Sequence, residues 1–260
     1  MKFSVLGSSS QGNATILINN GRCYLLDAGL GVRALYNRLN LLNAFVDQID
    51  AIFITHEHTD HISGLSSIVK KYNSTIYMSK KAYQNMDIKV KEQISPINFK
   101  FIKPDTEFIV DDMTVKTFSV SHDSAEPMGF SFISLDKKLT YITDTGILNV
   151  NEELVNSDAY ILESNHEEAL LLNSQRPWLL KERILGEYGH LSNALSAELF
   201  SKLRGPKTKN LVLFHLSQEC NSDLLALSEY KRYFKSINVS LDDLTIVVSD
   251  RSKPTQFIEV

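Results

Sequence analysis

This sequence has few of the residues that mark membrane, secreted or disulfide-rich proteins. It contains only two cysteines, Cys23 and Cys220, and each lies inside or beside an apolar segment, so we expect buried thiols in a reducing compartment. No stretch of the chain approaches the ~20 apolar residues that span a bilayer. The first residues lead straight into a short strand and lack the longer apolar core of a signal peptide. We therefore expect a cytoplasmic protein with no membrane contact.

Positive charge does not predominate either. The net charge is -4 at pH 7, which argues against a broad basic surface for nucleic acid. That expectation concerns the surface as a whole, because divalent ions held by carboxylates and neutral imidazoles would make one pocket locally positive. The remaining composition, with 43% hydrophobic and 22% charged residues, is that of a globular protein with a sizeable core.

Apolar segments of strand length alternate with helical periodicities, and this succession predicts an α/β fold with two packed sheets and outer helices. The expected strands are 3–6, 15–18, 23–26, 51–54, 75–78, 100–102, 107–110, 114–120, 129–134, 138–143, 159–162, 211–214 and 244–247. The expected helices are 32–42, 178–185, 194–203 and 224–234, with helical spacing also at 62–69. No repeat, low-complexity run or linker divides residues 1–260, so we expect a single domain.

Residues 55–61 read Thr-His-Glu-His-Thr-Asp-His, which places three imidazoles and a carboxylate on one short segment. An apolar run that reads as a buried strand precedes this segment, and a helical pattern follows it, so the segment is a tight turn between two packed elements. Zinc prefers histidine nitrogen and carboxylate oxygen as ligands. The turn therefore predicts a metal site that uses His56, His58, Asp60 and His61.

Three further candidate ligands each follow a predicted strand. They are His122, Asp144 and His215. Taken singly, each is more readily explained as an ordinary cap or turn residue, but together with the histidine turn the three are better explained as metal ligands. The predicted sets are His56, His58 and His122 for one ion and Asp60, His61 and His215 for the other. Asp144 would bridge them and hold the ions ~3.5–4 Å apart, the separation that two-metal hydrolases use.

The histidine turn followed by His122, Asp144 and His215 resembles the metallo-β-lactamase superfamily of binuclear hydrolases. The resemblance covers nearly the whole chain and implies a four-layer αββα sandwich with the metals at one edge of the paired sheets. It also assigns Asp27, in Asp-Ala-Gly after the strand 23–26, to the support of the metal-binding turn.

Five further segments are similar to those of one branch of that superfamily, the YycJ/WalJ exonuclease family. They lie at residues 7–13, 122–127, 163–167, 177–181 and 189–193. This resemblance implies 5′-to-3′ exonuclease activity on DNA. Residues 187–190 also resemble the catalytic histidine segment of the tRNA-processing enzyme RNase Z, but only a hairpin's length of chain separates His122 from Asp144. That length leaves no room for the long tRNA-binding arm of RNase Z.

The resemblance implies catalytic roles for Asp60 and His190. The expected nucleophile is a metal-bridging hydroxide, because bound metal lowers the pKa of water to about 7. Asp60 would orient this water or accept its proton. His190 would give a proton to the departing oxygen, a step that typically contributes ~10²–10⁴-fold. Without the resemblance, His190 is equally well explained as a helix-flanking residue.

Weaker signals concern substrate binding and support. Ser8, Ser9, Ser10 and Asn13 form a glycine-flanked loop that predicts a phosphate cradle, with a plain connecting turn as the alternative.

Three other positions have competing explanations. His166 would contact the substrate phosphate, support a metal ligand, or serve the structure of its loop. Glu163 would accept a hydrogen bond from a metal-bound histidine. Trp178 would stack on a base or pack as part of a core or lid.

The leading functional hypothesis is a binuclear phosphodiesterase acting on nucleic acid, with DNA favoured over RNA. Its alternatives are a thiolester hydrolase like glyoxalase II and an RNase Z-like ribonuclease. An iron-based redox module is disfavoured, because flavodiiron proteins have a glutamate where this chain has His58. The ligands suit two Zn²⁺ or Mn²⁺ ions, and the sequence does not choose between them. It does not predict the oligomeric state.

Overall fold

A computed structural model describes residues 1–260, which form two seven-stranded sheets packed face to face. The first sheet has the order β14 (Ile258–Glu259), β1 (Lys2–Gly7), β2 (Ala14–Asn19), β3 (Arg22–Leu26), β4 (Ala51–Phe53), β5 (Thr75–Ser79) and β6 (Phe99–Ile102). The second has the order β13 (Thr245–Val248), β12 (Asn210–Phe214), β11 (Ala159–Glu163), β10 (Lys137–Ile142), β9 (Met128–Ser134), β8 (Met113–Ser119) and β7 (Glu107–Val110).

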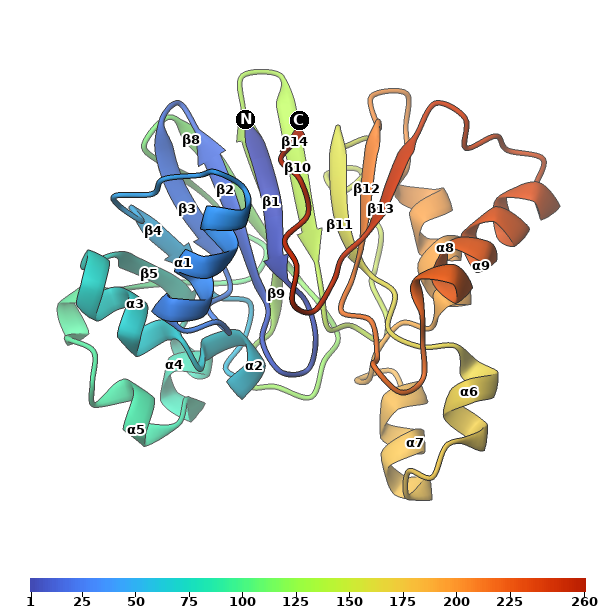
Figure 1. Ribbon diagram of the computed structural model, residues 1–260, viewed down its shortest axis with the longest axis horizontal. Coiled ribbons are helices and arrows are strands. Elements are labelled where there is room, and N and C mark those ends of the chain that lie inside the picture. Colours follow the sequence, from blue (N-terminus) through green and yellow to red (C-terminus); the bar gives the residue numbers. More distant parts are fainter.

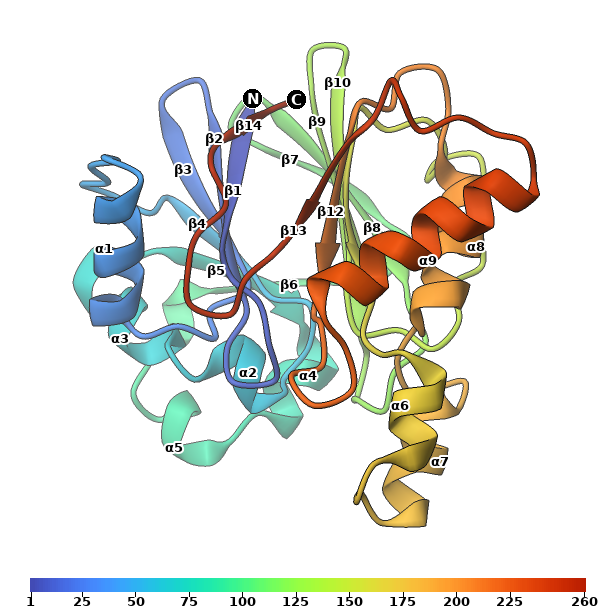
Figure 2. The same cartoon turned by 45° about the vertical axis from the view of Figure 1, so that its right-hand side comes forward.

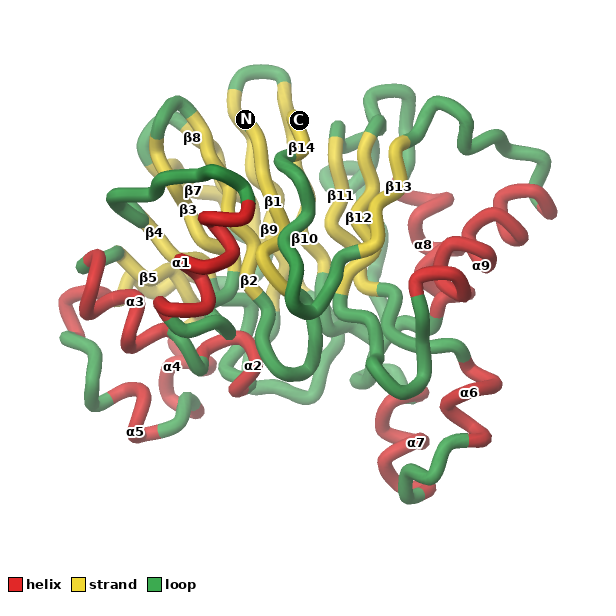
Figure 3. Tube along the Cα trace, viewed as in Figure 1, coloured by secondary structure: helices red, strands yellow, loops and turns green.

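Helices cover the outer face of each sheet (Figures 1 and 3). The first sheet carries α1 (Val32–Leu41), α2 (Thr59–Ile62), α3 (Leu65–Tyr72), α4 (Lys80–Asn85) and α5 (Ile88–Lys91). The second carries α8 (Asn193–Leu203) and α9 (Asp223–Ser236). Two further helices, α6 (Glu168–Asn173) and α7 (Trp178–Leu185), project beyond the sheets as an arm (Figure 2). The α/β prediction of a layered αββα sandwich is confirmed.

The central strands bury both of their faces, which explains their nearly continuous apolar sequences. In β3, Leu25 points to the layer under the helices, whereas Tyr24 and Leu26 point to the layer between the sheets. In β12, Leu213 and Val212 divide in the same way. The layer between the sheets contains 20 buried apolar residues drawn from both sheets. A single domain over residues 1–260 stays a prediction, and this shared core supports it.

The topology collects the ends of many strands at one edge of the sandwich. Strands β3 to β6 are mutually parallel, and so are β10 to β13. Parallel neighbours bring their carboxyl ends to the same edge, and both sheets present this edge on the same side of the molecule (Figure 1). The loops that follow these strands are therefore held close together by rigid elements.

The predicted strands are all present, but the sequence patterns missed several short elements. Helices α4, α5 and α6 have 6, 4 and 6 residues, which is too short to show helical periodicity. Strand β14 has only two residues, and it exists because it pairs with β1 at the edge of the first sheet. None of the helices combines the length and the apolar character needed to cross a bilayer.

We predict that Phe53→Ala will destabilise the sandwich strongly. Phe53 is fully buried between the sheets, and its ring lies 5.1 Å from Tyr77 and 5.0 Å from Phe132 of the opposite sheet, measured between centroids. Truncation of such a side chain leaves a cavity and costs about 3–5 kcal/mol of the free energy of unfolding. Urea unfolding measures this loss, and Phe45→Ala, at a ring that is 87% exposed, is the matched control. A loss in Phe53→Ala no larger than that of the control would contradict the described packing.

Candidate active site

Backbone hydrogen bonds from two other loops hold the histidine turn in place. The Asn13 amide donates to the Asp60 carbonyl over 2.8 Å, and the Ala28 amide donates to the His61 carbonyl over 2.7 Å. Glycine is required at Gly29, because a Cβ there would lie only 1.7 Å from the Asp60 carbonyl oxygen. The side chain of Glu57 turns away from the site and accepts a hydrogen bond from the Ala125 amide. These contacts fix the turn on both sides.

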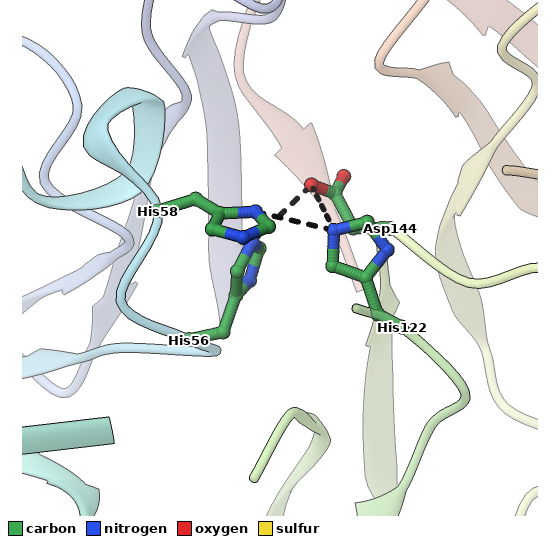
Figure 4. A group of neighbouring side chains, drawn as sticks. All are labelled: His56, His58, His122 and Asp144. Atoms are coloured by element: carbon green, nitrogen blue, oxygen red, sulfur yellow. Dashed lines mark hydrogen bonds and ion pairs between the residues drawn. The ribbon is translucent and has the colours of Figure 1, made fainter. Parts of the chain in front are cut away.

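One cluster of potential metal donors consists of His56, His58, His122 and Asp144 (Figure 4). Their donor atoms all lie within 4.8 Å of one another. Asp144 Oδ2 is 3.4 Å from His56 Nε2 and 3.7 Å from His122 Nε2. His58 Nδ1 lies 3.3 Å from His122 Nε2. Histidines from the turn after β4 thus face a histidine and an aspartate that come from the second sheet.

A second cluster consists of Asp60, His61, Asp144 and His215, again within 4.8 Å. His61 Nε2 is 3.1 Å from Asp144 Oδ2 and 3.4 Å from Asp60 Oδ2. The other carboxylate oxygen of Asp144, Oδ1, lies 2.6 Å from His215 Nδ1. The structure therefore brings all seven predicted ligands together in the two predicted sets, and Asp144 belongs to both.

Three acidic or imidazole side chains at this edge begin from a left-handed backbone. Asp27, Asp144 and His215 follow β3, β10 and β12 with φ angles of 57°, 48° and 57°. Non-glycine residues seldom adopt this conformation, and it costs roughly 1–3 kcal/mol where the surroundings impose it. The left-handed conformation turns the chain sharply at the end of each strand. The backbone then leaves in a loop, and the side chain at the turn stays in the site.

Three of the candidate ligand imidazoles are held by the ring nitrogen that faces away from the clusters. His61 Nδ1 lies 2.8 Å from Asp27 Oδ2, and His122 Nδ1 lies 3.2 Å from the Gly189 carbonyl oxygen. His56 Nδ1 lies 3.0 Å from Thr55 Oγ1. Asp27 also accepts a hydrogen bond from the buried Tyr141 hydroxyl over 2.9 Å. Such partners fix the ring orientation and the tautomer of metal-binding histidines, and Asp27 has the supporting position that the sequence suggests.

The chemistry of the clusters fits divalent cations. His56 Nε2 is buried and has no hydrogen-bond partner, although a buried polar atom of this kind is normally paired. Burial and the neighbouring His61 hold the pKa of His56 well below its usual value, so this imidazole is neutral and presents a lone pair. Burial opposes the charge of Asp144, but His215 and His61 hold the pKa of this carboxyl well below its usual value. Neutral nitrogens and carboxylate oxygens converging on shared points are the donors that Zn²⁺ and Mn²⁺ bind.

His190 and Glu163 form a pair beside the clusters. Glu163 Oε1 lies 2.6 Å from His190 Nδ1, while Oε2 accepts hydrogen bonds from the Thr145 and Leu191 amides. Glu163 thus holds His190 instead of one of the seven predicted ligands, and its support of a metal-bound histidine stays a prediction. Burial disfavours charge on His190, but Glu163 outweighs this effect and raises the pKa of His190 to about 9.

The His190 ring itself stands between the two clusters. Its centroid is 5.1 Å from that of His122 and 5.4 Å from that of His215. His190 Nε2 makes no hydrogen bond within the chain, and the side chain is 20% exposed.

The predicted phosphate cradle is only partly accessible. Asn13 is fully buried, and its side-chain amide donates to Asp60 Oδ2 over 3.0 Å, so it orients a candidate ligand from beneath. Ser9 is 5% exposed and accepts from the Gln11 amide within the loop. Ser8 accepts from the His215 amide over 2.6 Å. Asn13 is therefore placed to orient Asp60, whereas substrate contact by Ser9, whose hydroxyl keeps its proton to donate, stays a prediction. Ser10 is exposed and lines a cavity beside His190.

His166 and Trp178 differ in exposure. His166 is 1% exposed, and neither ring nitrogen has a hydrogen-bond partner. Burial lowers the pKa of His166 to about 4, so the ring is neutral. It does not line the cavity beside His190, and substrate contact by His166 stays a prediction. Trp178 is 59% exposed at the start of α7 and donates through Nε1 to Glu182, so it is not part of the core.

Some supporting residues were missed by the reading of the sequence. Tyr141 lies inside β10 and reads as an ordinary core aromatic, but its hydroxyl reaches Asp27. Thr55 lies directly before the histidine turn and donates to Asp27 over 3.0 Å. Thr55 could have been found from its place at the end of a strand, next to the ligands. No local signal distinguishes Tyr141, because its partner is 114 positions away.

The comparisons with known proteins agree with this geometry. Residues 22–216 match the family model described as the beta-lactamase superfamily domain. Exodeoxyribonuclease WalJ of Streptococcus pneumoniae is 35% identical over 228 residues, which cover 86% of this chain and 85% of WalJ. Exodeoxyribonuclease YycJ of Bacillus anthracis is 33% identical over 228 residues, which cover 87% of this chain and 86% of YycJ. The crystal structure of Zn²⁺-bound PqqB from Methylobacterium extorquens shares the fold, with a TM-score of 0.71, 15% identity and full coverage of both chains.

The chain therefore belongs to the metallo-β-lactamase superfamily, within the family that contains the WalJ and YycJ exodeoxyribonucleases. It is a metal-dependent hydrolase with a buried histidine and aspartate site.

We predict that Asp27→Asn will weaken metal binding about 10–100-fold, the usual effect of losing a partner of a ligand histidine. The amide keeps the size of the side chain but removes the charge that holds His61 Nδ1. Titration of the metal-free protein with Zn²⁺ measures the affinity, and Asp136→Asn, at an exposed turn, is the matched control. An unchanged affinity in a folded Asp27→Asn protein would show that Asp27 serves the fold alone.

Proposed function

We propose that this protein is an exodeoxyribonuclease, a binuclear phosphodiesterase that removes nucleotides from the 5′ end of DNA. The observation that carries the proposal is the position of His190. A proton donor braced by Glu163 stands beside both donor clusters, where a phosphodiester held there would release its leaving oxygen. The names of the relatives, both exodeoxyribonucleases, support DNA as the substrate.

The seven clustered side chains would hold two divalent ions, Zn²⁺ or Mn²⁺. When bound, the ions supply Lewis acidity, which polarises a phosphoryl oxygen and lowers the pKa of water to about 7. Asp60 is a carboxylate at neutral pH, because His61 outweighs the effect of burial and lowers the pKa of Asp60 to about 2. A carboxylate of such low basicity is better suited to orienting a water molecule than to keeping its proton. Asn13 fixes Asp60 for this task.

His190 acts at the other side of the scissile bond. Its Nδ1 is held by Glu163, so only Nε2 is available to a substrate. Protonation by Nε2 lets the leaving oxygen depart as a hydroxyl group instead of an alkoxide. A thiolate leaving group has little need for such a proton, which favours a phosphodiester over the thiolester of a glyoxalase II-like reaction. The residues between His122 and Asp144 form the hairpin of β9 and β10. They leave no room for the tRNA-binding arm of an RNase Z-like ribonuclease.

We predict that the purified protein loaded with Zn²⁺ or Mn²⁺ will shorten 3′-labelled DNA from its 5′ end. Asp144→Ala removes the carboxylate that both clusters share, and we expect its rate to fall by about 10³-fold or more. His58→Ala should act in the same direction, whereas Asp136→Ala at an exposed turn should not. Gel analysis of a time course measures the products, with labelled RNA and lactoylglutathione as parallel substrates. Turnover of lactoylglutathione with intact DNA would refute the nuclease proposal.

We predict that His190→Ala will lower kcat by about 10²–10⁴-fold on DNA, because the leaving oxygen loses its proton donor. Glu163→Gln should lower kcat less, because it removes the charge but leaves a hydrogen-bonding group. The distinguishing substrate is bis(p-nitrophenyl) phosphate, whose leaving group departs without protonation. On this substrate His190→Ala should be close to the wild type, with an unchanged metal content. An equal loss on both substrates would instead mean that His190 positions the metals.

A further inference from the structure

A cavity of about 180 Å³ opens beside the donor clusters, and neither the metal ligation nor the proton transfer uses it. His190 and His215 form its wall toward the clusters, and Ser10 and Ser217 add hydroxyl groups. The opposite wall comes from the α6–α7 arm, the part of the chain that projects from the sandwich in Figure 2. The cavity therefore lies between the candidate proton donor, His190, and the α6–α7 arm outside the two sheets.

The arm contributes two arginines to this cavity, Arg176 from the loop between α6 and α7 and Arg183 from α7. Arg176 donates through Nε to Glu219 over 2.9 Å and through one terminal nitrogen to Ser217 over 3.4 Å. Arg183 donates through Nε to Asp123. The carboxylates position the guanidinium groups without exhausting them, because Arg183 keeps both terminal nitrogens free of partners and Arg176 keeps one.

Two positioned guanidinium groups with adjacent hydroxyls suit a phosphate. Arginine presents several N–H donors in a planar fork, which matches phosphate oxygens. A terminal phosphate monoester carries close to two negative charges at pH 7, whereas a phosphodiester inside a strand carries one. A pair of arginines matches the terminal group better. Asp123 also lines the cavity, and each arginine is paired with one carboxylate, Arg183 with Asp123 and Arg176 with Glu219. The match to phosphate therefore rests on the guanidinium N–H groups that these carboxylates leave free.

The position relative to His190 identifies which phosphate this is. In the proposed reaction water bonds to phosphorus, the bond from phosphorus to O3′ of the first nucleotide breaks, and O3′ takes the proton of His190. The first nucleotide therefore lies on the His190 side of the scissile bond. The 5′-phosphate of this first nucleotide is the next phosphate along the strand. His190 lines the arginine cavity, so the cavity lies on the same side of the scissile bond as this phosphate.

We infer that this cavity binds the 5′-phosphate of the strand that is being degraded, an inference that rests on the proposed nuclease function. Arg176 and Arg183 hold the phosphate, Ser10 and Ser217 complete its hydrogen bonds, and the scissile bond is thereby set one nucleotide away. Hydrolysis leaves the attacked phosphate on the shortened strand as a new 5′-phosphate. Each turnover thus creates the group that the cavity binds in the next.

The test compares two DNA strands of one sequence, labelled at the 3′ end, that carry a 5′-phosphate or a 5′-hydroxyl group. The wild-type holoenzyme should favour the phosphorylated strand by about tenfold or more in kcat/KM for the first cleavage, the scale of a lost charge-assisted contact. Arg176→Ala and Arg183→Ala should each bring this ratio toward one, mainly by slowing the phosphorylated strand. Arg232→Ala, at an exposed arginine of α9 that is paired with Glu229, is the matched control and should keep the ratio.

Glu219→Gln separates phosphate binding from a structural role of the arm. It removes the ion pair of Arg176 but keeps the arginine, so the preference for the phosphorylated strand should persist or increase. If Glu219→Gln loses the preference as Arg176→Ala does, the ion pair only holds the arm in place and the inference fails. Equal slowing of both strands by Arg176→Ala would mean that the cavity binds a phosphate inside the strand, which also overturns it. Wild-type degradation without any preference refutes the cavity inference alone, whereas a complete lack of DNA degradation refutes the nuclease proposal.

Discussion

The shared carboxylate of Asp144 is the contact on which the rest of this site depends. Its two oxygens lie within 3.4 Å of His56, His61 and His215, which reach it from both sheets. Such an arrangement needs two rigid sheets whose strands end at the same edge, because no single loop could hold these groups against one another. The core of 20 apolar residues between the sheets therefore has a functional consequence. It sets the distance between the half of the site after β4 and the half after β10 and β12.

Burying several polar groups close together costs free energy unless each group is hydrogen-bonded, and the surrounding structure supplies such partners. Asp27 and the Gly189 carbonyl satisfy the outward-facing nitrogens of His61 and His122, so the inward-facing nitrogens are left for metal. The left-handed backbone at Asp144 and His215 is a second cost, and it is imposed by well-packed strands on either side of each turn. Bound cations would complete the balance by neutralising the converging lone pairs and carboxylates.

The groups proposed to act on substrate come from two different parts of the molecule. His190 lies before α8 and is held through Glu163 at the end of β11, so it belongs to the sandwich. Arg176 and Arg183 belong to the α6–α7 arm, and they contact the sandwich through Glu219, Ser217 and Asp123. The arm also packs on the loop after β12 through a small apolar cluster of Leu171, Ile184 and Cys220. The candidate metal donors and the proposed proton donor are thus built on the sheets, whereas the inferred phosphate contacts are built on the arm.

The local sequence indicated every strand except the two-residue β14, and it indicated the candidate metal ligands. Apolar runs predict strands wherever both faces of a strand are buried. The histidine turn predicts a metal site because three imidazoles and an aspartate are close in sequence. Local sequence did not determine that Asn13 lies beneath Asp60 instead of facing substrate, that Glu163 braces His190, or that Tyr141 reaches Asp27. Those pairs are 47, 27 and 114 positions apart, and each depends on how two loops or sheets dock. Docking is set by the summed packing of many side chains, so only the tertiary structure decided which polar groups meet.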